Sequence, residues 1–135
     1  MRAFRIQYDK GVAKWVRQLT VDFSNWFLEN FGVDHQIKIR LFAAGYLDTG
    51  NESVAYATFF RRYGKPNIYV ATWWYYWRDD GHVKDRQEAR EEFLDSLAHE
   101  FCEYHKWRRG VPNNHRGIQR QIDSLVRRFE HDNPR

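Results

Sequence analysis

Apolar residues recur every three or four positions in three stretches of the chain, which is the spacing of an amphipathic helix. The stretches cover residues 12–31, 85–108 and 113–129. Gly32 follows the first stretch and Gly110 the second, and glycine is common just after a helix ends. Asn113 or Asn114 can cap the third. The pattern therefore predicts three helices.

A two-residue alternation separates the first helix from the second and predicts strands. Residues 37–41 alternate between Ile or Leu and Lys or Arg, so one face is buried and the other meets solvent. Turn chemistry follows at 45–51, and residues 53–60 predict a second strand that we expect to pair with the first as an antiparallel hairpin. Residues 61–66 then predict a turn, and residues 67–73 a strand that is apolar on both faces.

These elements predict an α+β fold, with a long N-terminal helix, a small mixed sheet of three to four strands and two helices that follow the sheet. The alternating residues 2–8 predict a further short strand or an arm. A chain of 135 residues with 42% hydrophobic content has the size of one domain, so we expect a single domain over residues 1–135.

The amino-acid composition limits the cellular compartments and the binding partners that we expect for the protein. Cys102 is the only cysteine, so no internal disulfide is expected, and the start Met1–Arg5 predicts no signal peptide. Charged residues interrupt every helical stretch, so we expect no membrane span and a cytoplasmic protein. The net charge of +4 permits nucleic-acid binding but does not identify it.

The second predicted helix carries a dense group of chemically active side chains over residues 97–105. His99 and Glu103 stand one helical turn apart, so both can reach the same metal ion, and Glu100 lies beside them. His105 is turned about 120° away from His99, towards the apolar stripe. We therefore expect His105 to be a core or supporting residue.

Two ligands on one helix leave a zinc site incomplete. His115 is the best third candidate, because we expect it in the first turn of the last helix, which a short connection folds back against the second. Two imidazoles and a carboxylate suit zinc, and also iron or manganese. Alternatively Cys102 closes a structural site with four protein ligands, or it is a small buried apolar group.

The sequence around this cluster resembles a known motif. His99-Glu100 is the first half of the HExxH signature of zinc metallopeptidases, in which both histidines bind zinc and the glutamate is the general base. The wider context is similar to small zincin-like domains of the minigluzincin type. That similarity rests on Leu97-Ala98-His99-Glu100, Tyr104, Trp107, Arg109-Gly110, Pro112 and Arg116-Gly117-Ile118.

The resemblance implies a zinc-dependent peptidase in which two ligands have exchanged places. Glu103 stands where the family has its second histidine, and His115 stands where it has a glutamate ligand. Glu100 would be the general base, and the substrate would be a peptide or protein. By the same resemblance, the strand at 68–73 would pair with extended substrate, with the aromatic run 74–77 at its end.

A second hypothesis is a catalytically inactive zincin-like fold that serves as a binding module. Its arginine and aromatic side chains would contact nucleic acid or a partner protein. The aromatic run 74–77 fits this hypothesis as a surface for stacked bases, although the same rings could also pack over the edge of the core.

Overall fold

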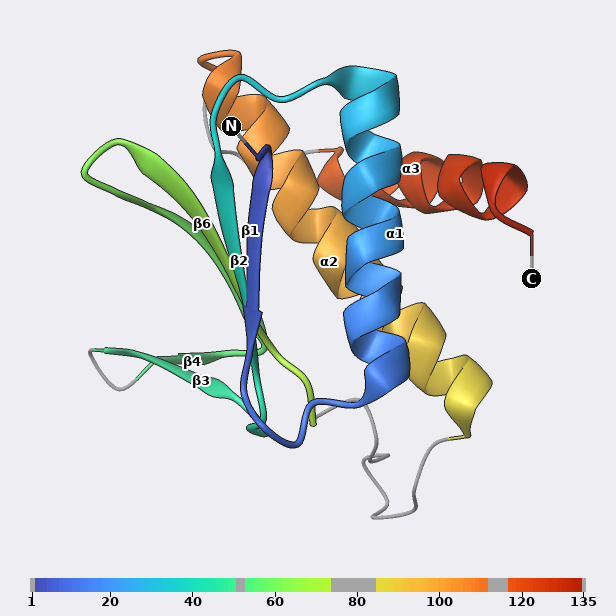
Figure 1. The fold of residues 1–135 in the computed structure, drawn as a ribbon. Coiled ribbons are helices and arrows are strands. Elements are labelled where there is room, and N and C mark those ends of the chain that lie inside the picture. Colours follow the sequence, from blue (N-terminus) through green and yellow to red (C-terminus); the bar gives the residue numbers. More distant parts are fainter. Residues whose placement is uncertain (1, 51–52, 74–84, 112–116, 135) are drawn as a thin grey trace.

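The computed structural model describes residues 2–50, 53–73, 85–111 and 117–134, and three helices and six strands lie within them (Figure 1). The helices are α1 (Lys14–Phe31), α2 (Arg86–Arg108) and α3 (Ile118–Asp132). The strands are β1 (Phe4–Tyr8), β2 (Ile37–Phe42), β3 (Leu47–Gly50), β4 (Ser53–Ala55), β5 (Ala57–Arg62) and β6 (Lys65–Ala71). The architecture is α+β, as predicted.

Four of the strands form one mixed sheet in the order β1-β2-β6-β5. β1, β2 and β6 are parallel, and β5 runs antiparallel to β6 at the edge. The predicted hairpin between residues 37–41 and 53–60 is wrong, because β2 pairs in parallel with β1 and β6. The helix α1 provides the long crossover that parallel pairing of β1 and β2 requires. The turn region at 45–51 belongs instead to a separate β3–β4 hairpin.

β6 is an interior strand, which changes where an extended substrate could pair. Its two neighbours, β2 and β5, occupy its backbone on both sides, so the expectation that residues 68–73 offer a pairing edge is wrong. β5 forms the edge of the sheet next to β6. A two-residue turn joins the two strands, with Tyr63 at φ 54° and Gly64 at φ 75°. Positive φ at both positions is the mark of a type I′ hairpin turn.

All three helices lie on the same side of the sheet in Figure 1. α2 contacts α1, α3, β5 and β6 and is therefore the central helix. The core lies between the helices and the sheet, where the ring of Phe101 packs 5.1 Å from that of Phe23 and 4.8 Å from that of Phe27. Among the described residues, no helix combines the length and the apolar character that crossing a membrane requires.

The helix ends agree with the sequence in two cases and differ in the third. Gly32 is the C-cap of α1, and Asp85 caps α2 by accepting a hydrogen bond from the Glu88 amide at 2.9 Å. α3 begins only at Ile118, with Gly117 as its N-cap at φ 74°. α3 thus begins later than the sequence predicts, and Asn113, Asn114 and His115, the predicted cap and first-turn residues, lie outside the described residues. The glycine is favoured at the cap because it adopts positive φ without a clash.

Candidate metal centre on helix α2

The apolar stripe of α2 determines where its polar side chains point. Leu94, Leu97, Ala98 and Phe101 are completely buried against the rest of the core. Because the helix turns about 100° per residue, anchoring these positions places His99 and Glu103 together on the side of the helix roughly opposite the stripe. The predicted stripe is confirmed, and it explains why two polar side chains of α2 share one side.

His99 and Glu103 approach each other closely. His99 Nε2 lies 3.5 Å from Glu103 Oε1, and the two side chains are 37% and 10% exposed. Two ligand atoms of one tetrahedral zinc ion, at about 2.0–2.1 Å from the metal, stand about 3.4 Å apart. The two side chains are therefore already spaced as ligands of one ion, and the imidazole remains accessible to solvent.

Glu100 adjoins this pair and is buried in an unusual way. It is only 5% exposed, and its Oε2 has no hydrogen-bond partner within the described part of the chain. Burial, and secondly the negative charge of Glu103, raise the pKa of Glu100 to about 8. A carboxyl group in this state holds a proton near neutral pH, and a cation beside it would favour the ionised form.

A pocket of about 460 Å³ opens between β5 and α2. It is lined by Phe59, Phe60, Arg61, Glu103, Lys106, Trp107 and Val111. Glu103 thus lies in the wall that faces the edge strand. A chain segment that entered this pocket would therefore contact Glu103.

His105 lies on another side of α2, as the sequence predicts. Its ring centroid is 6.4 Å from that of Phe27 and 6.1 Å from that of Phe31, and its Nδ1 accepts a hydrogen bond from Arg108 Nε at 3.1 Å. Burial, and next the positive charge of Arg108, lower the pKa of His105. His105 therefore packs against α1 and faces away from the His99–Glu103 pair.

Cys102 shares a second pocket, of about 470 Å³, with His105. This pocket lies between α1, α2 and α3, and Leu125 and Arg128 of α3 are among its lining residues. Burial raises the pKa of the Cys102 thiol to about 12. Cys102 is thus buried, as one of the two alternatives that the sequence left open expects.

Asp95, which the HExxH-like motif does not include, belongs to the same surroundings. It stands one turn before His99, whose charge acts on it, and its side chain is hydrogen-bonded to Gln119 of α3. Burial, and next the charge of Asp123, raise the pKa of Asp95. The signal that could have identified it is the same four-residue spacing that links His99 to Glu103.

The third predicted ligand, His115, lies outside the described residues, as does the aromatic run 74–77. Within residues 2–50, 53–73, 85–111 and 117–134, no group of three His, Cys, Asp or Glu side chains is arranged to hold a metal ion. Asp95 therefore does not complete the pair. Comparison of the chain with models of known protein families, with curated proteins and with solved structures yields no match.

Proposed function

We propose that this protein is a zinc-dependent metallopeptidase of the zincin class. His99, Glu103 and His115 hold the ion, and Glu100 is the general base. The observation that carries the proposal is the 3.5 Å spacing of His99 Nε2 and Glu103 Oε1 beside a buried, unpaired carboxylate oxygen of Glu100. An imidazole and a carboxylate at this separation fit zinc, and iron or manganese use the same donor types.

The packing of α3 on α2 supports the choice of His115. The Gln119 side chain contacts Asp95, and Asp95 lies one turn from His99. His115 precedes Gln119 by four residues, a separation that an extended chain can span over about 13 Å at most. His115 is therefore close enough in sequence to the Gln119–Asp95 contact to be the third ligand that the proposal requires.

The roles of the residues follow from their positions. When bound, zinc supplies Lewis acidity, which makes water acidic and polarises a carbonyl group. Glu100 accepts a proton from the attacking water and later donates it to the nitrogen of the leaving amine. Burial raises the pKa of Glu100 to about 8 in the metal-free chain, and a cation bound beside it would favour the ionised form that a general base requires.

We place the substrate along β5. This strand pairs only with β6 among the described elements, so its outer edge can hydrogen-bond to an extended peptide. Phe59 and Arg61 of β5, together with Glu103, line the pocket between the strand and α2. A peptide added to this edge runs past the proposed ligands. The substrate class is therefore an unfolded or extended segment, because a folded protein keeps its backbone paired.

Metal analysis tests the ligand set. Purified protein is expected to hold about one zinc per chain, and His99→Ala and His115→Ala to lose it. His105→Ala is the matched control, because it removes an imidazole from the opposite side of α2 and should retain the metal. Zinc retained by the His115 variant, or a wild-type protein that takes up no zinc, would overturn the site.

A separate assay tests the role of Glu100. Zinc-loaded wild type should cleave a fluorescein-labelled unfolded casein, and Glu100→Gln should lose most of this activity while keeping its zinc. Proton transfer by a positioned side chain contributes roughly a hundred- to ten-thousand-fold to rate, so the loss should be of that size. Cleavage at the wild-type rate by the metal-loaded variant would exclude Glu100 as the base.

A further inference from the structure

The strands of the mixed sheet have a strongly biased charge. β1, β2, β5 and β6 contain no acidic residue. They contain six basic ones: Arg5, Lys38, Arg40, Arg61, Arg62 and Lys65. The whole chain has a net charge of only +4, so the excess of positive over negative charge lies on the sheet strands.

Strand register places five of these six cations on the same side. Lys38 and Arg40 alternate with the buried core residues of β2, so they point away from the helices. Arg5 lies opposite Lys38 in the register, and this assigns it to the same side. We call this side, with Arg5, Lys38, Arg40, Arg62 and Lys65, the outer sheet face.

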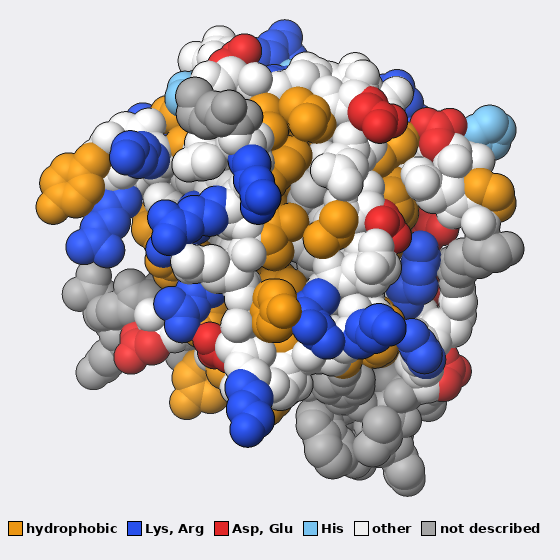
Figure 2. Space-filling view, viewed as in Figure 1, with side chains coloured by type: hydrophobic (Ala, Val, Ile, Leu, Met, Phe, Trp, Pro, Cys, Tyr) orange, Lys and Arg blue, Asp and Glu red, His pale blue; other side chains and the backbone are white. Residues whose placement is uncertain are grey.

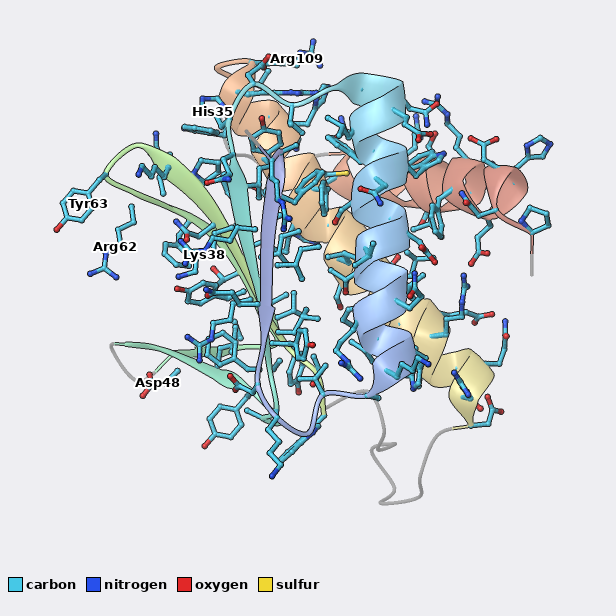
Figure 3. The ribbon with its side chains drawn as sticks, viewed as in Figure 1. His35, Lys38, Asp48, Arg62, Tyr63 and Arg109 are labelled. Carbon is cyan, nitrogen blue, oxygen red and sulfur yellow. The ribbon has the colours of Figure 1, made fainter. Side chains whose placement is uncertain are left out.

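The two arginines at the end of β5 illustrate this alternation. Arg61 points towards α2, where its guanidinium lies 5.7 Å from the ring centroid of Trp107. Arg62 therefore points the opposite way, and its register partner is Lys65. Figure 3 shows Lys38 and Arg62 extending from the side of the sheet that carries no helix.

The outer sheet face presents its charge to solvent. Basic side chains gather on the left of Figure 2, over this side of the sheet and the β5–β6 hairpin. Arg40, paired with Asp9 at 3.0 Å, is the only one of the five in an ion pair among the described residues. Asp48 lies on the β3–β4 hairpin, at the other end of this side from Tyr63 (Figure 3). Four cations thus remain for an anionic partner.

Aromatic rings accompany these cations. On the outer sheet face, the half-buried ring of Tyr69 packs 5.1 Å from Phe42 and 4.7 Å from Phe60. Tyr63, at the tip of the β5–β6 turn, is 91% exposed and is held at φ 54°. Positive φ is unfavourable for a bulky side chain, and Asn or Gly would occupy this turn more easily. The Arg62 guanidinium lies 5.9 Å from the Tyr63 ring centroid.

We propose that the outer sheet face, together with Tyr63, binds single-stranded nucleic acid. Arg5, Lys38, Arg62 and Lys65 contact phosphates, and the exposed ring of Tyr63 stacks on a base. A single strand is favoured over a duplex because a duplex hides the base faces that an aromatic ring stacks on. The proposal does not depend on the peptidase assignment, because α2 packs on the opposite side of the sheet (Figure 1).

Fluorescence anisotropy with a fluorescein-labelled oligothymidylate of about 20 nucleotides tests the proposal. Four phosphate contacts predict that log K falls with log salt with a slope of about −2.8. Lys38→Glu combined with Arg62→Glu should weaken binding at least tenfold and reduce the slope to about −1.4. The matched control reverses two exposed cations of α3, Arg120→Glu with Arg127→Glu, and should change affinity less than threefold.

Two further variants test the stacking role. Tyr63→Asn removes the ring and keeps a residue that tolerates positive φ, so it should weaken binding about tenfold without loss of fold. Tyr63→Phe keeps the ring and should bind like wild type. The proposal is overturned by an unchanged affinity of Tyr63→Asn, by equal losses in the sheet and α3 charge reversals, or by a duplex that binds as tightly as the single strand. Preferential binding to anionic phospholipid vesicles would also overturn it.

Discussion

Replacing Glu100 by Gln in the metal-free protein should remove a loss of stability that Glu100 causes as the pH rises. The pKa of Glu100 is raised from 4.5 to about 8 in the folded chain, chiefly by burial. The native state therefore holds a proton that the unfolded state releases above pH 4.5. The contribution of Glu100 to the free energy of unfolding has its full value below pH 4.5 and is lost progressively as the pH rises through 8.

The size of the effect follows from the two pKa values. One pKa unit corresponds to about 1.4 kcal/mol, so a rise from 4.5 to about 8 amounts to roughly 5 kcal/mol. Between pH 5 and pH 8 the wild type should lose about 3.5 kcal/mol of unfolding free energy on this account. Glu100→Gln stays neutral throughout, so its stability relative to wild type should increase by that amount over the same range.

Urea unfolding followed by tryptophan fluorescence, with a chelator present, measures this difference between pH 5 and pH 8. Comparing variant with wild type at each pH cancels the titration of all other groups. Glu91→Gln makes the same chemical change on an exposed side chain of α2 and controls for the loss of one negative charge. Parallel stability curves for Glu100→Gln and wild type would refute the buried, protonated state.

Two further predictions concern the packing of the helices. Phe101→Ala should cost about 3–5 kcal/mol in urea unfolding, because its completely buried ring packs against Phe23 and Phe27. A loss below about 1 kcal/mol would contradict this packing. The hydrogen bond from Trp26 Nε1, at 2.8 Å, is the main cause that lowers the pKa of Asp132, so stability should fall as Asp132 is protonated below its ordinary pKa of 3.8. Asp132→Asn should show a smaller loss of stability in acid than wild type, and identical acid unfolding would contradict that role.

The helices could be predicted because their information is local. The apolar stripe of α2 indicates which side of the helix is buried. Gly32 and Asp85 cap helix ends through interactions with backbone groups of the adjoining turn. The predicted start of α3 was wrong because it, too, depended only on local side-chain preferences. Asn113 and Asn114 are good capping residues, but the cap is Gly117, a choice that the side-chain preferences alone did not indicate.

The pairing of the strands could not be predicted in the same way. The alternation in residues 37–41 shows which side chains face the core, and the structure agrees. It says nothing about the neighbouring strands, because β1 and β6 bond to β2 through backbone groups that every residue carries. The turn residues around Asp48 indicated a hairpin correctly, but the chain bends at Tyr56, so this hairpin ends with β4 and β5 joins β6 instead.

The candidate site likewise combines features that sequence spacing predicts with features that depend on tertiary packing. The closeness of His99 and Glu103 is a property of one helix, so spacing alone predicted it. The burial of Glu100 and the neighbouring charges of Asp95 and Asp123 depend on how α2 packs in the fold, and spacing did not reveal them. His115 lies outside the described residues, so the third ligand stays a prediction.

The separation of charge between the sheet and α2 links the two proposals. Every charged residue of β1, β2, β5 and β6 is basic, whereas α2 has more acidic residues than Lys and Arg residues; its acidic residues are Glu88, Glu91, Glu92, Asp95, Glu100 and Glu103. In the two proposals the basic strands attract the polyanion and the acidic residues of α2 attract the metal cation, so the two ligands bind at separate sites. Chelation of zinc should therefore leave oligonucleotide affinity unchanged, and Lys38→Glu with Arg62→Glu should leave zinc content unchanged. Loss of zinc in the sheet variant would show that the two sites are not independent.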